Sequence, residues 1–245
     1  MSALVLKLIA CICMLLDHIG YCWGIGSLRI VGRIAFPIFV YLIYNGYRHT
    51  SSKAKYALRL ALFALISQIP FNLFGYGTLW SNNGNVFFTL LAALLCLWSV
   101  DGMFHHRILR WFSLLPTLAV CLLYYKGILA SDYGAIGILM LLVFYFCDRP
   151  GAIWKVLTVL GFYCAIYHGQ LLQALLSLMG NTPLPVLSPW WLTQFYAGLA
   201  LPFIFAYNGE KGTIGGKTGG KLLQYGFYLF YPLHMVVLWL IFQLT

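Results

Sequence analysis

The sequence predicts an all-α protein, a polytopic membrane bundle of about nine or ten transmembrane helices that forms a single domain over residues 1–245. Composition is the first reason: 62% of the residues are hydrophobic and 8% are charged, and the mean hydropathy is +0.87. One water-soluble domain cannot bury so much apolar surface. The second reason is that the apolar residues form separate runs, each close to the length that crosses a hydrocarbon core of about 30 Å.

These runs follow one another along the whole chain. Hydropathy predicts spans near residues 3–23, 28–46, 57–75, 86–103, 110–125, 132–147, 152–168, 190–207 and 222–243. The apolar piece at 169–180 is short, and we expect it to be re-entrant or interfacial, with a tenth true span as the alternative. The first run is not followed by a small-x-small cleavage pattern, so we expect it to remain as a span.

The basic residues predict the orientation. Eleven of the 15 Lys and Arg residues lie in the segments 47–59, 104–110, 148–155 and 208–221. Because positive loops stay in the cytoplasm, the N-terminus is predicted to be cytoplasmic, in a multi-pass protein of the inner (plasma) membrane. The net charge of +10 therefore reflects topology and contact with anionic lipids rather than binding of nucleic acid.

The first span carries two ionisable residues, Asp17 and His18. Ionisable groups at that depth cost roughly 2.5 to 3.5 kcal/mol each and usually have a function. Lys7 lies on the same helix face as His18, about 16 Å away along the axis, because eleven residues return to within roughly 20° of the starting direction. Asp17 does not share that face and needs a partner from elsewhere; the nearest cations in sequence are Arg29 and Arg33.

The second span contains Arg33 four residues before Pro37. The proline predicts a kink whose freed carbonyl finds a neighbour. Arg33 cannot lose its proton, so it must pair with an anion or face water.

Two basic segments have alternative interpretations. Arg48, His49 and Arg59 lie in and after a loop rich in Ser and Thr; this loop either only sets the topology or binds the phosphates of a polyanionic ligand. The glycine-rich turn with Asn208 and Lys211 lacks the glycine spacing and the preceding strand of a P-loop. It remains a basic turn able to contact phosphate.

Polar residues at later helix ends also have two interpretations. Asn85 and Asp132 each precede a predicted span, where a helix cap is the common role. In the last span, Tyr231 and His234 share one face at i and i+3. A lone intramembrane histidine is often an interhelical hydrogen bonder, but His234 reaches a depth comparable with that of His18, and the two together favour a site.

The order of these residues resembles the TraX family, named for the F-pilin acetylation protein. The resemblance covers nearly the whole chain, through the motifs Lys7 before Asp17-His18, Gly32-Arg33-Ile34-Ala35-Phe36-Pro37-Ile38-Phe39, Gly46 before His49-Thr50, Tyr56 before Arg59-Leu60, Ser67 before Pro70-Phe71, Asn85-Val86 before Phe88-Thr89, Tyr207-Asn208-Gly209, and Phe230-Tyr231-Pro232 before His234. The chain departs from the family pattern at Asn45, Gln68 and Asn72, where acids are usual. The family is similar to a wider group of transmembrane acyltransferases, so the resemblance implies an acetyl-CoA-dependent acetyltransferase with Asp17 and His18 at the reaction centre.

Acyl transfer needs a base for the acceptor proton and a donor for the developing oxyanion. We expect His18 to be the base, and Asp17, ionised by Arg33 or Arg29, to order the site. The candidate oxyanion donors are Tyr231, His234 and Asn85.

The distance from Lys7 to His18 is comparable with the reach of a phosphopantetheine arm. Acetyl-CoA is therefore expected to enter from the cytoplasm, with its phosphates at the cytoplasmic mouth. The candidate phosphate-binding residues are Lys7, Arg48, His49, Arg59, Asn208 and Lys211.

Two other functions stay open. A transporter or proton pathway would use Asp17, His18 and His234 as a relay, although no inverted repeat is visible. A non-catalytic assembly factor for a surface structure would not need Lys7 and His18 in register. The expected partners are membrane lipids and an acceptor, either a protein N-terminus such as pilin or a glycan. No metal is expected, because the seven cysteines lack paired spacing.

Overall fold

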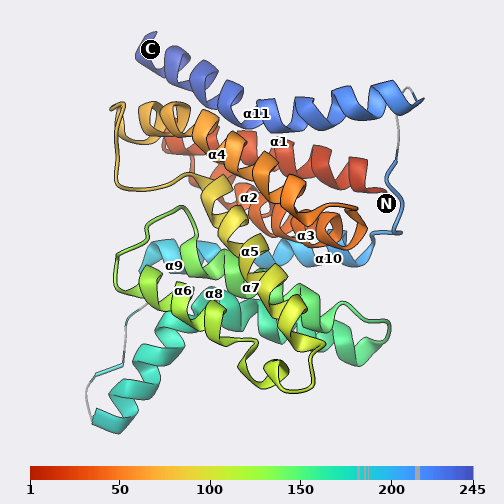
Figure 1. The fold of residues 1–245 in the computed structure, drawn as a ribbon. Helices are drawn as coiled ribbons and strands as arrows, with labels where there is room; N and C mark the ends of the chain where they lie inside the picture. The colour runs from red at the N-terminus through yellow and green to blue at the C-terminus, as the bar shows by residue number, and fades with distance from the viewer. Residues whose placement is uncertain (181–182, 185, 187, 213–215, 245) are drawn as a thin grey trace.

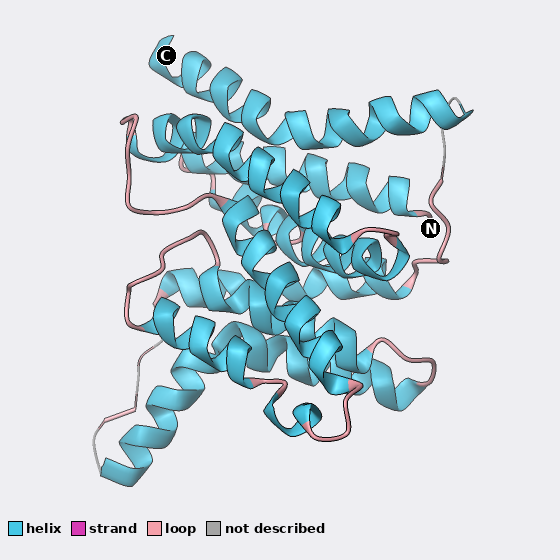
Figure 2. Cartoon of the chain, viewed as in Figure 1, coloured by secondary structure: helices cyan, strands magenta, loops and turns pink. Residues whose placement is uncertain are grey.

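The computed structural model describes residues 1–180, 183–184, 186, 188–212 and 216–244. Within these ranges the chain forms helices and no β-strand (Figure 2). Six helical segments are long and apolar enough to cross a membrane: Ala3–Cys22, Gly26–His49, Lys53–Tyr76, Val86–Phe104, Ala152–Gly180 and Tyr225–Leu244. The predicted fold class, an all-α polytopic membrane bundle, is confirmed.

The helices occur in the order of the predicted spans (Figure 1). They are α1 (Ala3–Cys22), α2 (Gly26–Gly32), α3 (Ala35–His49), α4 (Lys53–Tyr76), α5 (Val86–Phe104), η1 (Leu109–Phe112), α6 (Leu115–Tyr125), α7 (Gly134–Cys147), α8 (Ala152–Gly180), α9 (Pro189–Gln194), η2 (Phe195–Ala200), α10 (Leu201–Phe205) and α11 (Gly216–Leu244).

Three predicted spans consist of shorter pieces. The span at 110–125 is η1 followed by α6, the span at 132–147 is α7, and the span at 190–207 is divided among α9, η2 and α10. The 14 residues of α7 extend only about 21 Å, less than a hydrocarbon core of about 30 Å. Six long helices are fewer than the nine or ten spans predicted, and the difference lies in these three segments.

One face of the bundle gathers the basic segments. The backbone amide of Ala3 donates to the Glu210 carbonyl at 2.8 Å, so the chain before α11 lies beside the amino terminus (Figure 1). The Asn45 amide donates to the Tyr207 hydroxyl at 2.9 Å, which joins the end of α3 to the same segment. Arg48, beyond Asn45 on α3, pairs at 3.0 Å with an aspartate just after α7. The predicted grouping of these loops on one face is thus observed.

The core and the outside of the bundle are both apolar. At its centre α1 packs against α2, α3 and α11, and α5 packs against α4 and α7. Leu6, Ile38 and Leu94 are fully buried there. Large apolar side chains such as Leu65 and Ile69 on α4 are more than half exposed, as expected for a helix that faces lipid tails rather than water.

The segment 169–180 is the continuation of α8 rather than a separate piece. The helix has non-helical backbone angles at Tyr167, φ −100° and ψ 15°, and its last part projects away from the bundle (Figure 1). Leu171 and Leu178 on this part are exposed. The chain returns to the bundle through α9, where the Trp191 carbonyl accepts from the Tyr167 hydroxyl at 2.9 Å.

Candidate active site

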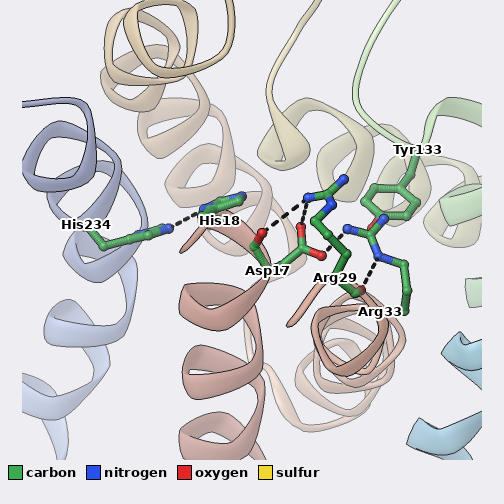
Figure 3. A network of polar contacts seen from close by, with 6 residues as sticks. All are labelled: Asp17, His18, Arg29, Arg33, Tyr133 and His234. Atoms are coloured by element: carbon green, nitrogen blue, oxygen red, sulfur yellow. Dashed lines mark hydrogen bonds and ion pairs between the residues drawn. The ribbon is translucent and has the colours of Figure 1, made fainter. Parts of the chain in front are cut away.

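Asp17 on α1 pairs with both arginines of the second span. Arg29 Nη1 lies 2.5 Å from Asp17 Oδ2, and Arg33 Nη2 donates to Asp17 Oδ1. Arg33 also donates through Nε to the Arg29 carbonyl at 3.3 Å. Figure 3 shows the two guanidinium groups converging on the one carboxylate. The prediction that one of these arginines would neutralise Asp17 is confirmed, because both do.

A break between α2 and α3 brings Arg33 to this position. Pro37 has no backbone N–H, and its ring clashes with the carbonyl of the residue four positions earlier, which is Arg33. The helix is accordingly interrupted at Arg33 and Ile34. Gly32 permits the close approach of α1, since a Cβ there would overlap the Asp17 side chain. The single span predicted for 28–46 is therefore two helices that share one charged joint.

The loop before α7 completes the charged cluster. The Tyr133 hydroxyl accepts from Arg33 Nη1 at 3.0 Å, and the Tyr133 ring stacks on Phe36 with centroids 3.7 Å apart. Tyr133 has φ +65°, a left-handed conformation that non-glycine residues seldom adopt. Thr89 on α5 holds this turn by donating to the Asp132 carbonyl.

Asp132 is not the helix cap that its position in the sequence suggested. The N-cap position of α7 is Tyr133, without a side-chain cap hydrogen bond, and the Asp132 side chain lines a cavity instead. Burial raises the pKa of Asp132 to about 6, and nearby Arg33 opposes that shift. In the sequence, an acid at the start of a span looks the same whether it caps the helix or lines a cavity.

His18 and His234 are in direct contact. His18 Nδ1 lies 2.6 Å from His234 Nε2, and His234 Nδ1 lies 2.7 Å from the Phe230 carbonyl oxygen. Figure 3 shows His18 pointing toward α11 while Asp17, the next residue, points toward α2. Asp17 therefore does not orient His18 directly, as the helix geometry predicted. The two histidines were predicted to lie at comparable depth, and in the structure they form an interhelical hydrogen bond.

A cavity of about 250 Å³ joins these groups. Its polar lining includes Asp17, His18, Arg33, Asp132, Tyr133 and Tyr231. Aromatic side chains from α4 and α9 form part of its wall, among them Phe71, Phe74 and Trp190. The cavity thus combines residues from the first and last helices with the loop before α7.

The three candidate oxyanion donors have different hydrogen-bond partners in the structure. The Asn85 side chain caps α5 by accepting from the Phe87 amide at 3.0 Å. It donates to the Ala64 carbonyl at 2.7 Å and to Gln68 Oε1 at 2.9 Å, which uses both of its amide hydrogens. Asn85 therefore has no amide hydrogen left to act as the oxyanion donor, and the cap interpretation holds.

His234 has partners at both ring nitrogens, so it offers no free donor for an oxyanion. Tyr231 is 5% exposed and lines the cavity. Its hydroxyl oxygen faces the Val86 backbone amide at the start of α5. Of the three candidates, Tyr231 is thus the one that lines the cavity.

The predicted phosphate-binding residues fall into two groups. Lys7, Arg59 and Lys211 lie near the start of α1 and the facing parts of α4 and α11. Lys7 Nζ is 5.5 Å from the ring centroid of Phe227 on α11. The Lys211 backbone carbonyl accepts from the Leu4 backbone amide at 3.1 Å. Arg59 Nε is buried and has no hydrogen-bond partner among the described residues.

The other three residues have partners of their own. Arg48 Nη1 pairs with Asp148 Oδ2 at 3.0 Å. His49 Nδ1 lies 2.8 Å from the Asn45 carbonyl oxygen, and the Asn208 amide donates to Glu210 Oε2 at 2.9 Å. These contacts give each of the three side chains a partner within the protein. No group of three or more metal-ligating side chains occurs in the described part of the chain.

Fold and site together define a helical membrane protein with a charged, histidine-containing cavity between its first and last helices. The family model for TraX protein matches residues 2–242, and the chain belongs to that family. It is also 32% identical over 257 residues to the "Probable fimbrial assembly protein FimC, serogroup H1" of Dichelobacter nodosus, covering 97% of this chain and 94% of the relative. No solved structure matches it.

Proposed function

We propose that this protein is an acetyltransferase of the inner membrane that moves an acetyl group from cytosolic acetyl-CoA to an acceptor at the outer half of the membrane. The observation that carries the proposal is the position of His18. It lines a cavity beside buried charges, and on the same helix face Lys7 lies about 16 Å nearer the cytoplasmic end. Both face α11, through His234 and Phe227.

In the proposed reaction His18 Nε2 accepts a proton from the acceptor amine or hydroxyl. The acceptor atom then attacks the thioester carbonyl, and the C–S bond breaks as the acetyl group is transferred. The proton passes to the departing CoA thiolate. Tyr231 donates to the oxyanion of the tetrahedral intermediate, a contribution that is strong in a cavity from which water is excluded.

The charged cluster supports this reaction by position rather than by direct contact. With both arginines bound, the Asp17 carboxylate is directed away from His18. The pairing anchors α1 against α2, so the helix that carries His18 has a fixed rotation. We propose this ordering role for Asp17 and Arg33 in place of a direct contact with the base.

Acetyl-CoA fits the cytoplasmic group of cations. Its diphosphate and 3′-phosphate need several positive donors. Lys7 and Lys211 lie at the start of α1, and Arg59 lies on α4, which packs against α11. The buried Nε of Arg59, which lacks a partner in the described residues, is a donor that a phosphate oxygen would satisfy. The acceptor is a protein N-terminus or a glycan, which the outer half of the cavity receives.

The name of the relative favours a second function. FimC of Dichelobacter nodosus is described as a probable fimbrial assembly protein, so this chain could serve fimbrial or pilus assembly without catalysis. The two functions are compatible if acetylation of a fimbrial or pilus subunit is one step of its assembly. A non-catalytic factor would need neither a free base nor a cytosolic cofactor.

The test uses the purified protein in lipid nanodiscs with acetyl-CoA and a membrane extract as the source of acceptor. Thiol release is measured for the parent, for His18→Ala and for Ser99→Ala, a matched small change on α5 away from the cavity. His18→Ala should lower the rate by about 10² to 10⁴, the usual contribution of a positioned base, with CoA affinity by calorimetry nearly unchanged. A parent that neither binds CoA nor releases thiol would leave the assembly function as the better explanation.

A further inference from the structure

The hydrogen bonds of the histidine pair determine which ring nitrogens carry protons. A backbone carbonyl can only accept, so the 2.7 Å contact between His234 Nδ1 and the Phe230 carbonyl oxygen requires a proton on Nδ1. In a neutral imidazole the other nitrogen is then an acceptor. The 2.6 Å contact from His234 Nε2 to His18 Nδ1 therefore requires the proton on His18 Nδ1. It follows that His18 Nε2 bears a free lone pair.

Packing holds both rings in this arrangement. The two imidazole planes differ by only 5°, with centroids 4.9 Å apart. The His18 ring also contacts the Phe74 ring, with centroids 5.0 Å apart. The His234 ring stacks on the Phe230 ring, with centroids 4.9 Å apart. His234 is 7% exposed, so water competes little for its nitrogens. Neither ring can turn without breaking a hydrogen bond and an aromatic contact.

We propose that His234 is the positioning residue that fixes His18 in the tautomer protonated at Nδ1, so that Nε2 is the basic nitrogen. This inference rests on the proposed role of His18 as the base. A histidine base needs a partner that fixes its tautomer and ring orientation, and a carboxylate often serves. Here both oxygens of Asp17 are bound by arginines, so a neutral imidazole anchored on the Phe230 carbonyl takes that part.

The arrangement also accounts for the charge after proton transfer. When His18 Nε2 takes the acceptor proton, His18 becomes an imidazolium and its Nδ1–H donates more strongly to His234. His234 stays neutral and keeps its own proton on Nδ1. The proton then leaves from Nε2 to the CoA thiolate, and the pair returns to its first state without exchange of protons between the rings.

Two substitutions of similar chemistry separate positioning from simple packing. The side-chain amide of glutamine in His234→Gln reaches approximately the place of Nε2 and can accept from His18 Nδ1. The shorter amide in His234→Asn reaches only the place of Nδ1 and can bond to Phe230 but not to His18. Thermal melting of both variants in nanodiscs controls for folding.

Histidine labelled with ¹⁵N reads the tautomer directly in the parent, independently of activity. We expect His18 with a protonated Nδ1 and an unprotonated Nε2 in the parent and in His234→Gln, and a mixture of tautomers in His234→Asn. Acetyl transfer should fall less than about 10-fold in His234→Gln and about 10²-fold or more in His234→Asn. The pH profile should change only in the asparagine variant.

The inference is overturned if the parent carries its His18 proton on Nε2, or if the glutamine and asparagine variants have equal rates and equal spectra. These results concern His234 alone. An active His18→Ala protein, in contrast, would refute the base and thus the proposed function, while the tautomer measured in the parent would still test the hydrogen-bond assignment.

Discussion

One carboxylate, that of Asp17, pairs with two arginines inside the bundle. The three groups therefore carry one positive charge more than they carry negative charge. Asp17 is 7% exposed and Arg33 is 5% exposed. Removing one member of a buried ion pair typically costs about 3 to 5 kcal/mol, because the remaining charge has no partner. Asp132 balances the second arginine at longer range: Arg33 acts on it electrostatically without a direct ion pair in the described part of the chain.

This partial balance predicts a pH dependence of stability. The pKa of Asp132 is raised from its ordinary 3.8 to about 6, so the folded protein binds this proton more tightly than the unfolded chain. Its contribution is fully present below the unfolded pKa and is lost as the pH rises through about 6. Asp132→Asn should therefore become progressively more stable relative to the parent between pH 4 and pH 7, as thermal melting in nanodiscs would measure.

Ser99→Ala, on α5 away from the cavity, changes no ionisable group; it is the control and should show no such trend. A constant difference between Asp132→Asn and the parent across this range would mean that the folded protein does not hold the proton.

Single residues differ in how far the sequence predicts them. The partners of Asp17 could be predicted, since an acid in a membrane span requires a cation and the next two in sequence were arginines. Asp132 and Asn85 both precede helices, and local pattern cannot tell a cap from a cavity residue. The contact of His18 with His234 joins residues 216 positions apart, and only the packing of α1 against α11 creates it.

At the level of helices, the joint between α2 and α3 is the element on which the site depends. Pro37 interrupts the helical hydrogen-bond pattern at Arg33, the residue that pairs with Asp17. The sequence predicted a kink here but not two separate helices, because a proline alone does not fix how far a helix opens. The contact of Gly32 with Asp17 was not predictable, since it depends on how α1 and α2 approach.

The parallel course of α1 and α11 gives a prediction about the donor. Lys7 meets Phe227 and His18 meets His234, so both helices run in the same direction through the bundle. Lys7→Ala and Arg59→Ala should raise the KM for acetyl-CoA much more than they lower kcat, because contacts with phosphates far from the thioester bind ground and transition states equally.

Lys55→Ala removes an exposed cation from the first turn of α4 and should leave the KM unchanged. If calorimetry finds that the Lys7 and Arg59 variants bind CoA as tightly as the parent does, the donor enters by another route.

For the whole molecule, the bonds of residues 208–211 to the amino terminus predict a labelling pattern. In a variant without its natural cysteines, Glu210→Cys and Ser51→Cys should react with an impermeant maleimide only after spheroplasts are permeabilised. Asn82→Cys, in the loop between α4 and α5, should react in intact spheroplasts, because the positive-inside rule places it outside. Labelling of Glu210→Cys from outside would reverse the orientation.

Hydropathy predicted the succession of apolar segments well, because a membrane span is mostly a matter of length and composition. It could not predict that α7 is short, since neighbouring helices bury most of its residues. It also did not predict that η2 and α10 divide the eighth span, where Phe195 and Leu199 are exposed. The extension of α8 past Tyr167 was also missed, because His168 and Gln170 interrupt the hydropathy there without ending the helix.

The pairing of the first helix with the last also concerns biosynthesis. Helix α1 enters the membrane when most of the chain has not yet been made, and it already carries Asp17 and His18. The two arginines that pair with Asp17 follow 12 and 16 residues later, so its charge is paired early. The hydrogen-bond partner of His18 is His234 on α11, which is synthesised after the other helices that the structure describes. A chain that ends before α11 therefore contains His18 but not His234, and under the proposed function it would lack the residue that positions the base.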